Sequence, residues 1–475
     1  MPCGDTTQNA CLDILTALSV YKNSNNSDSL VLLLAGGVYS GPNNTDISLS
    51  NITLTIKSAN PNSQATIDMK SEAGFIIIAD TPVPTTTMLT ISYMTVTNSL
   101  GAAVTINISN VYTNVVMDNV IATNNNNNNG GVFNVQTSGH SSATTSVVIS
   151  NSVLNNNTAT NSGAVYYTST PGNLTIVNSV INNNIAGKTG ILYIIFSGLY
   201  LNNVTMSGNI ASSTLMAIAN VADTATINGL TYANNNLRNS GGSHIKSIES
   251  DVLITSSTFS GNNGGSIIQY KLSSLFYGRL LNINNCKFNQ NIGSSVGVLY
   301  MDSGAVLNLN NSVFTNNFAN DYGGALYLSG SYSAKVSNTL FNNTNVGDDG
   351  VGSTVYSSGV SSGLIFTNVT FNTTSNVTTP FYCSMSKLTF NNIKTNAKTF
   401  LSCASEDSCT VSGTSDAYSC KDEPADSNDH KKKGLTNGQV AGIVIGVILG
   451  IAFVIIIVYI AYKRHHNHHK YRSYH

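Results

Sequence analysis

The residues best suited to chemistry in this chain are a pair of carboxylates and a histidine close to a lysine. Asp348 and Asp349 precede Gly350, and His244 and Lys246 stand earlier in the chain. Paired acids, or a general base near a cation, can hydrolyse a sugar linkage or eliminate across it. These four residues are therefore the catalytic candidates. The alternative is a polar turn at the aspartates and a solvated surface at the histidine and lysine.

Few other residues could assist catalysis or bind a metal. The stretch from residue 85 to residue 411 holds only ten acids, at scattered positions, whereas a calcium site needs several oxygen ligands together. Its two histidines cannot complete a serine or cysteine triad. Four histidines near the C-terminal end, His465, His466, His468 and His469, are typical of a solubilising tail. We expect no cofactor and no metal.

Charge is scarce along the chain. Charged residues make up 9% of it, and the formal net charge is −1. The chain therefore lacks the basic surface that nucleic acid requires, and we expect no nucleic-acid partner. Hydrophobic residues reach 41%, which is enough to build a continuous core.

The seven cysteines gather mainly at the two ends of the repeated region. Disulfide-stapled caps would close the ends of a stack of repeats, and the candidates are Cys3, Cys11, Cys383, Cys403, Cys409 and Cys420. The last four alone allow three pairings. A metal site is the alternative, but no histidine neighbours these residues. Cys286 takes the place that Ser152, Ser179 and Ser312 hold in other repeats, and we expect a small buried side chain there.

A short phrase recurs down most of the chain, as at residues 149–154, 176–181 and 309–314. Apolar residues lead to an Asn or Ser, which is followed by more apolar residues and more Asn. The anchor of this phrase returns about every 27 residues, a period typical of solenoid repeats. The anchors are Asn119, Asn151, Asn178, Asn203, Gly229, Ser256, Asn285, Asn311, Asn338, Asn368 and Asn392.

Each repeat is too short to bury its own apolar face and must stack on its neighbours. Apolar and polar residues alternate with the period of a strand, and Gly and Asn separate the strands. The sequence predicts an all-β parallel solenoid of about a dozen coils, with about three short strands in each coil. We expect the anchor asparagines to point inward and to form a buried ladder of side-chain amides from coil to coil. The run of asparagines at 124–129 is expected to form a loop.

Several phrases in the second half of the chain carry a family resemblance. Three Phe-x-x-Asn phrases begin at Phe259, Phe288 and Phe314, and Gly-Gly-Ala-Leu-Tyr follows at 323–327. They resemble the FxxN and GGAI repeats of chlamydial polymorphic outer-membrane proteins. Over residues 85 to 400 the chain is also similar to the right-handed β-helix, or pectin-lyase-like, class. The resemblance implies a right-handed parallel β-helix, and the chlamydial relatives are adhesins.

The resemblance also bears on catalysis. Asp348, Asp349, His244 and Lys246 echo the acids, histidine and basic residue of polygalacturonases, but that family's Asn-Thr-Asp phrase is absent and the order of acids and histidine is reversed. We therefore favour a non-catalytic surface protein that serves adhesion or recognises a glycan or a protein. A membrane-tethered polysaccharide lyase or hydrolase is the alternative, and a structural coat or spacer is a third hypothesis.

Neutral amides and aromatic rings would form the binding surface of such a protein. Tyr93, Tyr112 and Tyr270 are expected to be exposed aromatic residues on the rod, where their rings could stack on a ligand.

Acceptors for N-glycosylation, Asn-x-Ser/Thr, precede residue 440 and indicate an extracellular chain. The candidates are Asn25, Asn43, Asn51, Asn107, Asn156, Asn173, Asn310, Asn342, Asn372 and Asn376. Asn203 and Asn368 also match the pattern, but as anchors they are expected to be buried and unmodified.

Residues 440–462 form an uncharged stretch, long enough to span a bilayer as a helix. Lys463 and Arg464 follow it. With the cysteines and acceptors, this arrangement predicts a single-pass protein of the plasma membrane, with its repeats outside the cell. The start of the chain shows no secretory signal, and we expect the signal to be missing from this chain. A tail-anchored protein is the alternative.

Gly442, Gly446 and Gly450 recur at the spacing that lets two membrane helices approach closely. A homodimer through this helix is a hypothesis; ordinary glycines of a membrane helix are the alternative.

The composition divides the chain into six parts. They are an N-terminal cap with the first coils (1–84), the β-helix repeats (85–400), a Cys-rich C-terminal cap (401–421), a polar stalk (422–439), the transmembrane helix (440–462) and a short basic, His-rich cytoplasmic tail (463–475). The bilayer and either glycans or cell-surface proteins are the expected partners.

Overall fold

The computed structural model describes most of residues 10–420. The gaps are 25–28, 80–85, 109–111, 138–143, 169–171, 222, 240, 273–277, 303, 332, 361, 374–378, 406, 415–417 and 419. Several predictions fall outside the described residues: Cys3, Asn25, Asn376, the stalk, the transmembrane helix with Gly442, Gly446 and Gly450, and the tail. Among the described residues, no helix has both the length and the apolar character needed to cross a bilayer.

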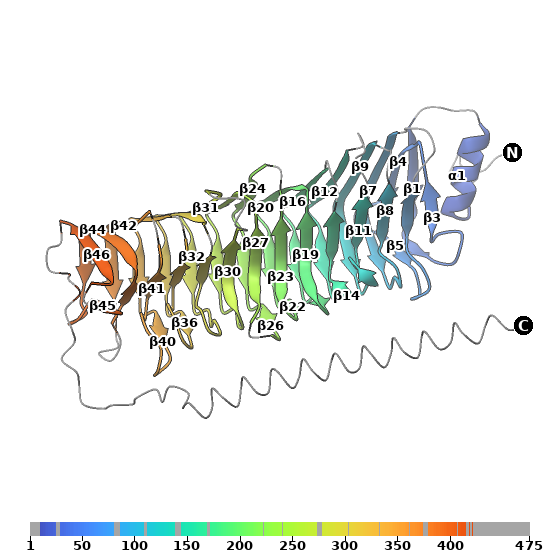
Figure 1. Cartoon of the computed structure of the whole chain (residues 1–475). Helices are drawn as coiled ribbons and strands as arrows, with labels where there is room; N and C mark the ends of the chain where they lie inside the picture. The colour runs from blue at the N-terminus through green and yellow to red at the C-terminus, as the bar shows by residue number, and fades with distance from the viewer. Residues whose placement is uncertain are drawn as a thin grey trace, which may run out of the picture. The chain divides into compact units, whose positions relative to one another are not determined.

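Stacked coils with parallel strands make up the described part of the chain (Figure 1). Equivalent strands of successive coils pair in register, so that Ile149 lies beside Ile176 and Val147 beside Leu174. The strands fall into three larger sheets, here named A, B and C, and one separate two-stranded pair. Sheet B has 14 strands, one from each coil that it crosses. The predicted parallel β-solenoid and its number of coils are confirmed.

Sheet A contains two strands of most coils. Its strands are β1 (Leu30–Leu34), β2 (Gly37–Tyr39), β4 (Thr53–Ser58), β5 (Ala65–Asp68), β7 (Thr86–Thr97), β9 (Tyr112–Thr123), β12 (Thr145–Ser150), β13 (Val153–Asn155), β16 (Gly172–Val177), β17 (Val180–Asn182), β20 (Gly198–Asn202), β21 (Thr205–Ser207), β24 (Ala225–Asn228), β25 (Thr231–Ala233), β28 (Val252–Thr255), β29 (Thr258–Ser260), β31 (Leu280–Asn284), β32 (Lys287–Asn289), β34 (Val306–Asn310), β35 (Val313–Thr315), β38 (Ser333–Ser337), β39 (Leu340–Asn342), β42 (Leu364–Asn372), β44 (Ser386–Thr395) and β46 (Cys409–Gly413).

Sheets B and C complete the coils. Sheet B contains β3 (Ile47–Leu49), β6 (Ile76–Ala79), β8 (Val104–Ile108), β11 (Phe133–Thr137), β15 (Val165–Thr168), β19 (Thr189–Ile195), β23 (Thr214–Ala219), β27 (Ser243–Ile248), β30 (Ser266–Lys271), β33 (Leu299–Asp302), β37 (Leu326–Ser329), β41 (Val355–Ser358), β43 (Phe381–Ser384) and β45 (Leu401–Cys403). Sheet C contains β10 (Asn126–Asn129), β14 (Thr158–Ser162), β18 (Ile185–Ala186), β22 (Ile210–Ala211) and β26 (Asn236–Leu237), and β36 (Phe318–Ala319) pairs separately with β40 (Asn345–Val346).

The anchor residues lie at corners on the surface, which corrects the prediction that they point inward. All eleven have φ between 48° and 63°, the left-handed region that Asn and Gly tolerate best. None is buried, and Asn203 and Asn368 are exposed. The left-handed residue bends sheet A. Its own side chain and that of the residue before it both point outward, so the alternation of inward and outward side chains shifts by one residue after the bend.

The buried amide ladder lies six residues after the anchors. It consists of Asn125, Asn157, Asn184, Asn209, Asn235, Asn262, Asn291 and Asn317, all at most 1% exposed. Each Nδ2 donates to the Oδ1 of the next member at 2.8–3.1 Å. Asn125 belongs to the 124–129 run, which continues into β10 and pairs with β14. That run is therefore part of a coil, and the predicted loop is wrong.

Aromatic rings form a second internal ladder next to the amides. Phe259, Phe288 and Phe314 stack at 4.8 and 4.5 Å between ring centroids, and Phe341 and Phe371 continue the column. In each Phe-x-x-Asn phrase, Phe and Asn therefore both point into the core. Cys286 is buried as expected, at the position of Ser312 in the next coil, and burial raises the pKa of its thiol to about 11.

A helix covers the first coils. Asp13 caps the N-terminus of helix α1 (Ile14–Asn23), because its Oδ1 accepts a hydrogen bond from the Thr16 backbone N–H at 2.7 Å. Ile14 and Leu18 are its buried side chains, so the helix covers apolar groups of the first coils. This helix was not predicted from the sequence, because its apolar stripe is only two turns long.

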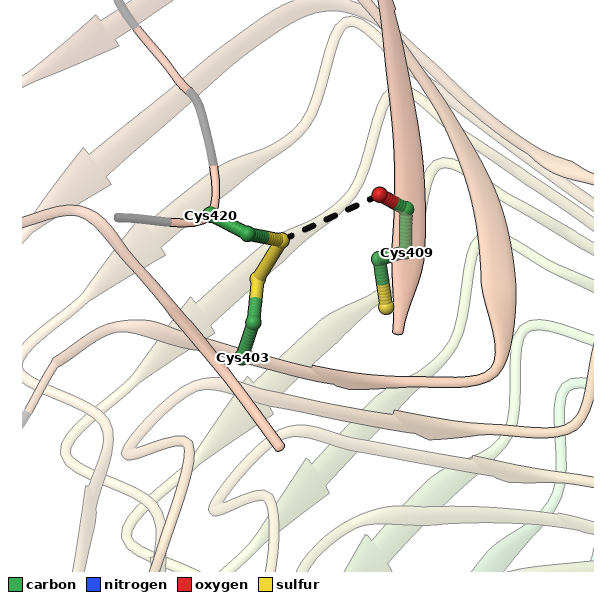
Figure 2. A group of neighbouring side chains, drawn as sticks. All are labelled: Cys403, Cys409 and Cys420. Carbon is green, nitrogen blue, oxygen red and sulfur yellow. Dashed lines mark hydrogen bonds between the residues drawn. A yellow bond between two sulfur atoms is a disulfide. The ribbon is translucent and has the colours of Figure 1, made fainter. Parts of the chain in front are cut away.

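Two disulfides connect the final coils, as expected of the cysteines there. Cys383 is bonded to Cys409, and Cys403 to Cys420. Figure 2 shows the sulfur atoms of Cys403, Cys409 and Cys420 close together, within 4.8 Å of one another. All three sulfurs are in disulfides, so this group lacks the thiolates that a metal would need. Cys11 is also disulfide-bonded.

Candidate functional site

The four catalytic candidates do not come together in the structure. Asp348 and Asp349 are exposed in the turn after β40, just before β41. His244 and Lys246 lie on β27, which is four strands away in sheet B. At the usual strand spacing this separates the two pairs by roughly 19 Å along the rod.

His244 is a core residue. Its Nδ1 lies 3.2 Å from the Tyr232 hydroxyl, and its Nε2 lies 3.1 Å from the Asn263 carbonyl oxygen. Burial lowers the pKa of His244 to about 4, although the contact with Asn263 opposes this shift. The histidine is therefore neutral in the folded protein at physiological pH and faces away from solvent.

Acid should destabilise the rod through His244. The unfolded chain binds a proton at this histidine near pH 6.5, whereas the folded chain does so only near pH 4. Stability is thus fully present above pH 6.5 and should fall by about 3 kcal/mol as the pH approaches 4. Urea unfolding at several pH values measures this fall, and His244→Gln should flatten it. An unchanged pH dependence in the variant would contradict the assignment.

Lys246 faces outward, in a column of side chains that runs along sheet B. Register places Tyr166 beside Tyr193, then Ala217, Lys246 and Gln269 in turn. The column continues through Tyr300, Tyr327, Tyr356 and Tyr382. Six of these nine rungs are tyrosines, and the tyrosine series is interrupted from Ala217 to Gln269.

The interruption forms a pocket of about 240 Å³, which we call the alanine trough. Ala217 and Ala219 of β23 form its floor. Tyr193 and Ile195 of β19 stand on one side, and Lys246 and Ile248 of β27 stand on the other. Ala217 and Ala219 carry only methyl groups, so the surface over β23 lies lower than the side chains of β19 and β27 on either side. The trough therefore runs along one strand and has the volume of a single ring-sized group rather than a drug-sized ligand.

Tyr193 has one ring face available to the trough. Its other face stacks on Tyr166, with ring centroids 5.1 Å apart and planes 3° from parallel. The next rung is Ala217, whose methyl group leaves the near face uncovered. Burial, and then the neighbouring Tyr166, raise the pKa of the Tyr193 phenol, so it stays protonated at neutral pH and can donate a hydrogen bond.

Polar groups line one end of the trough. They come from Thr189, Ser213, Thr214, Ser243 and Gln269, and from the backbone of Gly241 and Gly242. The Ser243 hydroxyl donates to the Gln269 Oε1 at 3.0 Å and so orients that amide. Lys246 is the single charged residue among those that line the pocket. The trough thus combines an aromatic face, hydrogen-bonding groups and one positive charge.

The whole chain has only weak similarity to known proteins. No protein-family model matches it, and no curated protein matches it at a significant level. Among solved structures, the A-module of the Azotobacter vinelandii mannuronan C-5 epimerase AlgE6 is similar at 9% identity and a TM-score of 0.33, covering 84% of this chain and 94% of that one. The PL6 family alginate lyase AlyGC is similar at 9% identity and a TM-score of 0.19, covering 84% and 92%. Likenesses this weak carry no argument about the site.

The sequence indicated Lys246 as a candidate but no other residue of the trough. Aligning the coils by register would have revealed two alanines at outward positions between Tyr193, Ile195 and Lys246, Ile248. The aromatic residues it named lie elsewhere. Tyr112 is 49% exposed and Tyr93 is half-buried. Tyr270 is fully buried, and its hydroxyl donates to the Ser250 carbonyl oxygen at 2.6 Å, so its predicted exposure is wrong.

The predicted glycosylation acceptors lie mostly at the surface. Those that are exposed are Asn43, Asn51, Asn107, Asn156, Asn173 and Asn372, whereas Asn310 and Asn342 are half-buried. Asn203 and Asn368, which were expected to be buried, are exposed as well, so a glycan chain could reach them.

Proposed function

We propose that this chain is a recognition protein that binds a glycan in the alanine trough. The observation that carries the proposal is the uncovered face of Tyr193 opposite Lys246 across a floor of two alanines. A sugar ring can stack its C–H groups on a tyrosine face while its hydroxyls bond to neighbouring polar groups. The ammonium group of Lys246 favours a sugar that carries an acidic group.

The disulfides and the glycosylation acceptors support a protein that acts outside the cell. The disulfides Cys383–Cys409 and Cys403–Cys420 are typical of oxidising compartments, and exposed glycosylation acceptors surround the rod. We propose that the chain is held at the plasma membrane by residues 440–462 and serves adhesion. The homodimer through Gly442, Gly446 and Gly450 remains part of this proposal.

A panel of acidic and neutral polysaccharides, immobilised and offered to the full-length chain, tests the proposal. We expect retention on an acidic polysaccharide that weakens as salt is raised, because the contact with Lys246 is screened. Lys246→Gln should remove the preference for acidic over neutral chains. Lys335→Gln is the matched control, because Lys335 is exposed on sheet A. Equal binding by both variants would overturn the role of the trough.

Cleavage of the polysaccharide is the second candidate function. Lys246 and Tyr193 stand two strand spacings apart, across the space that a sugar ring would fill. Elimination here would require Lys246 to act as a neutral amine that removes the proton from a carbon beside a carboxylate, while the protonated Tyr193 donates its proton to the leaving oxygen. Measuring released sugar in the same wells separates the two candidates. Loss of release in Lys246→Gln would favour this site, and loss in Asp348→Asn or Asp349→Asn would favour the carboxylate pair. If the chain shows no binding and releases no sugar, that result would favour a structural coat or spacer.

A further inference from the structure

Five tyrosines form a cluster on sheet B toward the C-terminal end of the rod. Tyr300, Tyr327, Tyr356 and Tyr382 are successive rungs of the outward column, with neighbouring ring centroids 5.0, 4.9 and 5.2 Å apart. Tyr322, in the segment that leads into β37, lies against two of them, 5.8 Å from Tyr327 and 4.9 Å from Tyr356. The tyrosine cluster is separate from the alanine trough, because Gln269 lies between Lys246 and Tyr300.

The ring planes distinguish the pairs within the cluster. Tyr327 and Tyr356 are stacked with planes 4° apart, and Tyr356 and Tyr382 with planes 10° apart, so these rings present faces to each other. Tyr322 meets Tyr356 at 56°. This pair is therefore not stacked face to face. Among the tilted or edge-on pairs of the cluster it has the shortest centroid separation, compared with 5.8 Å for Tyr322–Tyr327 and 5.0 Å for Tyr300–Tyr327.

The backbone holds Tyr322 and Tyr356 together. Tyr322 forms a parallel bridge with Val351, which lies five residues before Tyr356 in the next coil. Tyr327, five residues after Tyr322, pairs with Tyr356 through β37 and β41. Tyr322 is 37% exposed and Tyr356 is half-buried. A small oxidant can therefore reach the pair, while a second protein molecule has access mainly to Tyr322.

We propose that Tyr322 and Tyr356 form a site of oxidative crosslinking, in which a peroxide-driven one-electron oxidant joins the two rings. Each phenol loses one electron and its hydroxyl proton. The two phenoxyl radicals then form a carbon–carbon bond between their ortho carbons, and the hydrogens on those carbons move to the oxygens to restore both phenols. The pair loses two hydrogen atoms in all, and one hydrogen peroxide is reduced to two waters.

The full-length chain treated with a peroxidase and hydrogen peroxide tests this proposal. Trypsin cleaves after Lys335, which lies between the two tyrosines. After reduction of the disulfides, the crosslink should appear in mass spectra as a joined pair of peptides, lighter by two hydrogens than their sum, and as dityrosine fluorescence.

Matched variants decide which rings react. Tyr322→Phe should abolish the joined peptide, whereas Tyr327→Phe should leave it, although Tyr327 stacks more nearly parallel on Tyr356. Tyr193→Phe, in the separate stacked pair, should also leave it. Loss of the product in Tyr327→Phe but not in Tyr322→Phe would overturn the assignment, as would crosslinks that occur only between molecules. Dityrosine confined to Tyr166 and Tyr193 would also overturn it.

Discussion

Replacing Asn235 by alanine should lower the free energy of unfolding by about 3–5 kcal/mol, because several buried groups lose their partners at once. The Oδ1 of Asn235 accepts from both the backbone N–H and the Nδ2 of Asn209. Its Nδ2 donates to the Met206 carbonyl oxygen and to the Oδ1 of Asn262. All four hydrogen-bonding positions of the amide are thus used in a site without access to water.

The neighbouring asparagine supplies the control for this variant. Asn234 is exposed, with φ of 53°, so Asn234→Ala should cost only about 1 kcal/mol, from the strain of a left-handed alanine. Urea unfolding followed by circular dichroism measures both variants. Hydrogen exchange in Asn235→Ala should increase first in the coils that contain Asn209 and Asn262, since repeat interfaces respond locally. Equal losses in the two variants would show that the ladder contributes no special stability.

Replacing Ala217 by tyrosine should abolish ligand binding in the alanine trough while leaving the rod folded. Tyr193 and Ala217 are directly in register, and Tyr166 and Tyr193 already show that adjacent rungs can stack at 5.1 Å. A tyrosine at 217 would cover the free face of Tyr193 and fill the floor. A loss of about 100-fold in affinity, close to 3 kcal/mol, is expected if ring stacking and the polar contacts are both lost.

The control for Ala217→Tyr introduces a tyrosine at another rung of the same column, outside the trough. Thr105 is an outward rung beside Asn134, and Thr105→Tyr should bind the polysaccharide as the unaltered chain does. Affinity is measured with the polysaccharide that the panel identifies, and unfolding midpoints establish that both variants are folded. Undiminished binding by Ala217→Tyr would place the ligand elsewhere on the rod.

The repeat and the strand period were sufficient to predict the solenoid, but not which asparagine is buried. Each coil carries two candidates, such as Asn151 and Asn157, and both lie among alternating residues. A left-handed residue at the first shifts the alternation by one, so the buried residues run Val147, Ile149, Ser152 and Leu154 before Asn157. The interval of three between Ile149 and Ser152 is a signal that the sequence does contain. Its meaning depends on backbone geometry that strand periodicity alone does not provide.

The candidate site was harder to predict, because two small side chains, those of Ala217 and Ala219, create it. Motif reasoning looks for residues that could react, and it therefore selected His244, which is buried in the core, and Asp348 and Asp349, which lie in a turn. Ala217 and Ala219 have no chemistry of their own. They matter only because register places bulkier side chains on both sides. The neighbours of Ala217, Tyr193 and Lys246, are 24 and 29 residues away in the sequence, one coil in each direction.

The amide ladder also bears on how such a rod can change in length. Every coil from Asn157 to Asn291 receives the same hydrogen bonds from the coil before it and gives the same bonds to the coil after it. If the chain is divided between coils at equivalent ladder positions, the exposed faces of any two coils therefore offer matching hydrogen-bonding groups. Unequal recombination between repeats would add or remove whole coils without creating a new interface. The length of such a rod therefore changes by whole coils. The distance between its two ends can evolve independently of the trough on its surface.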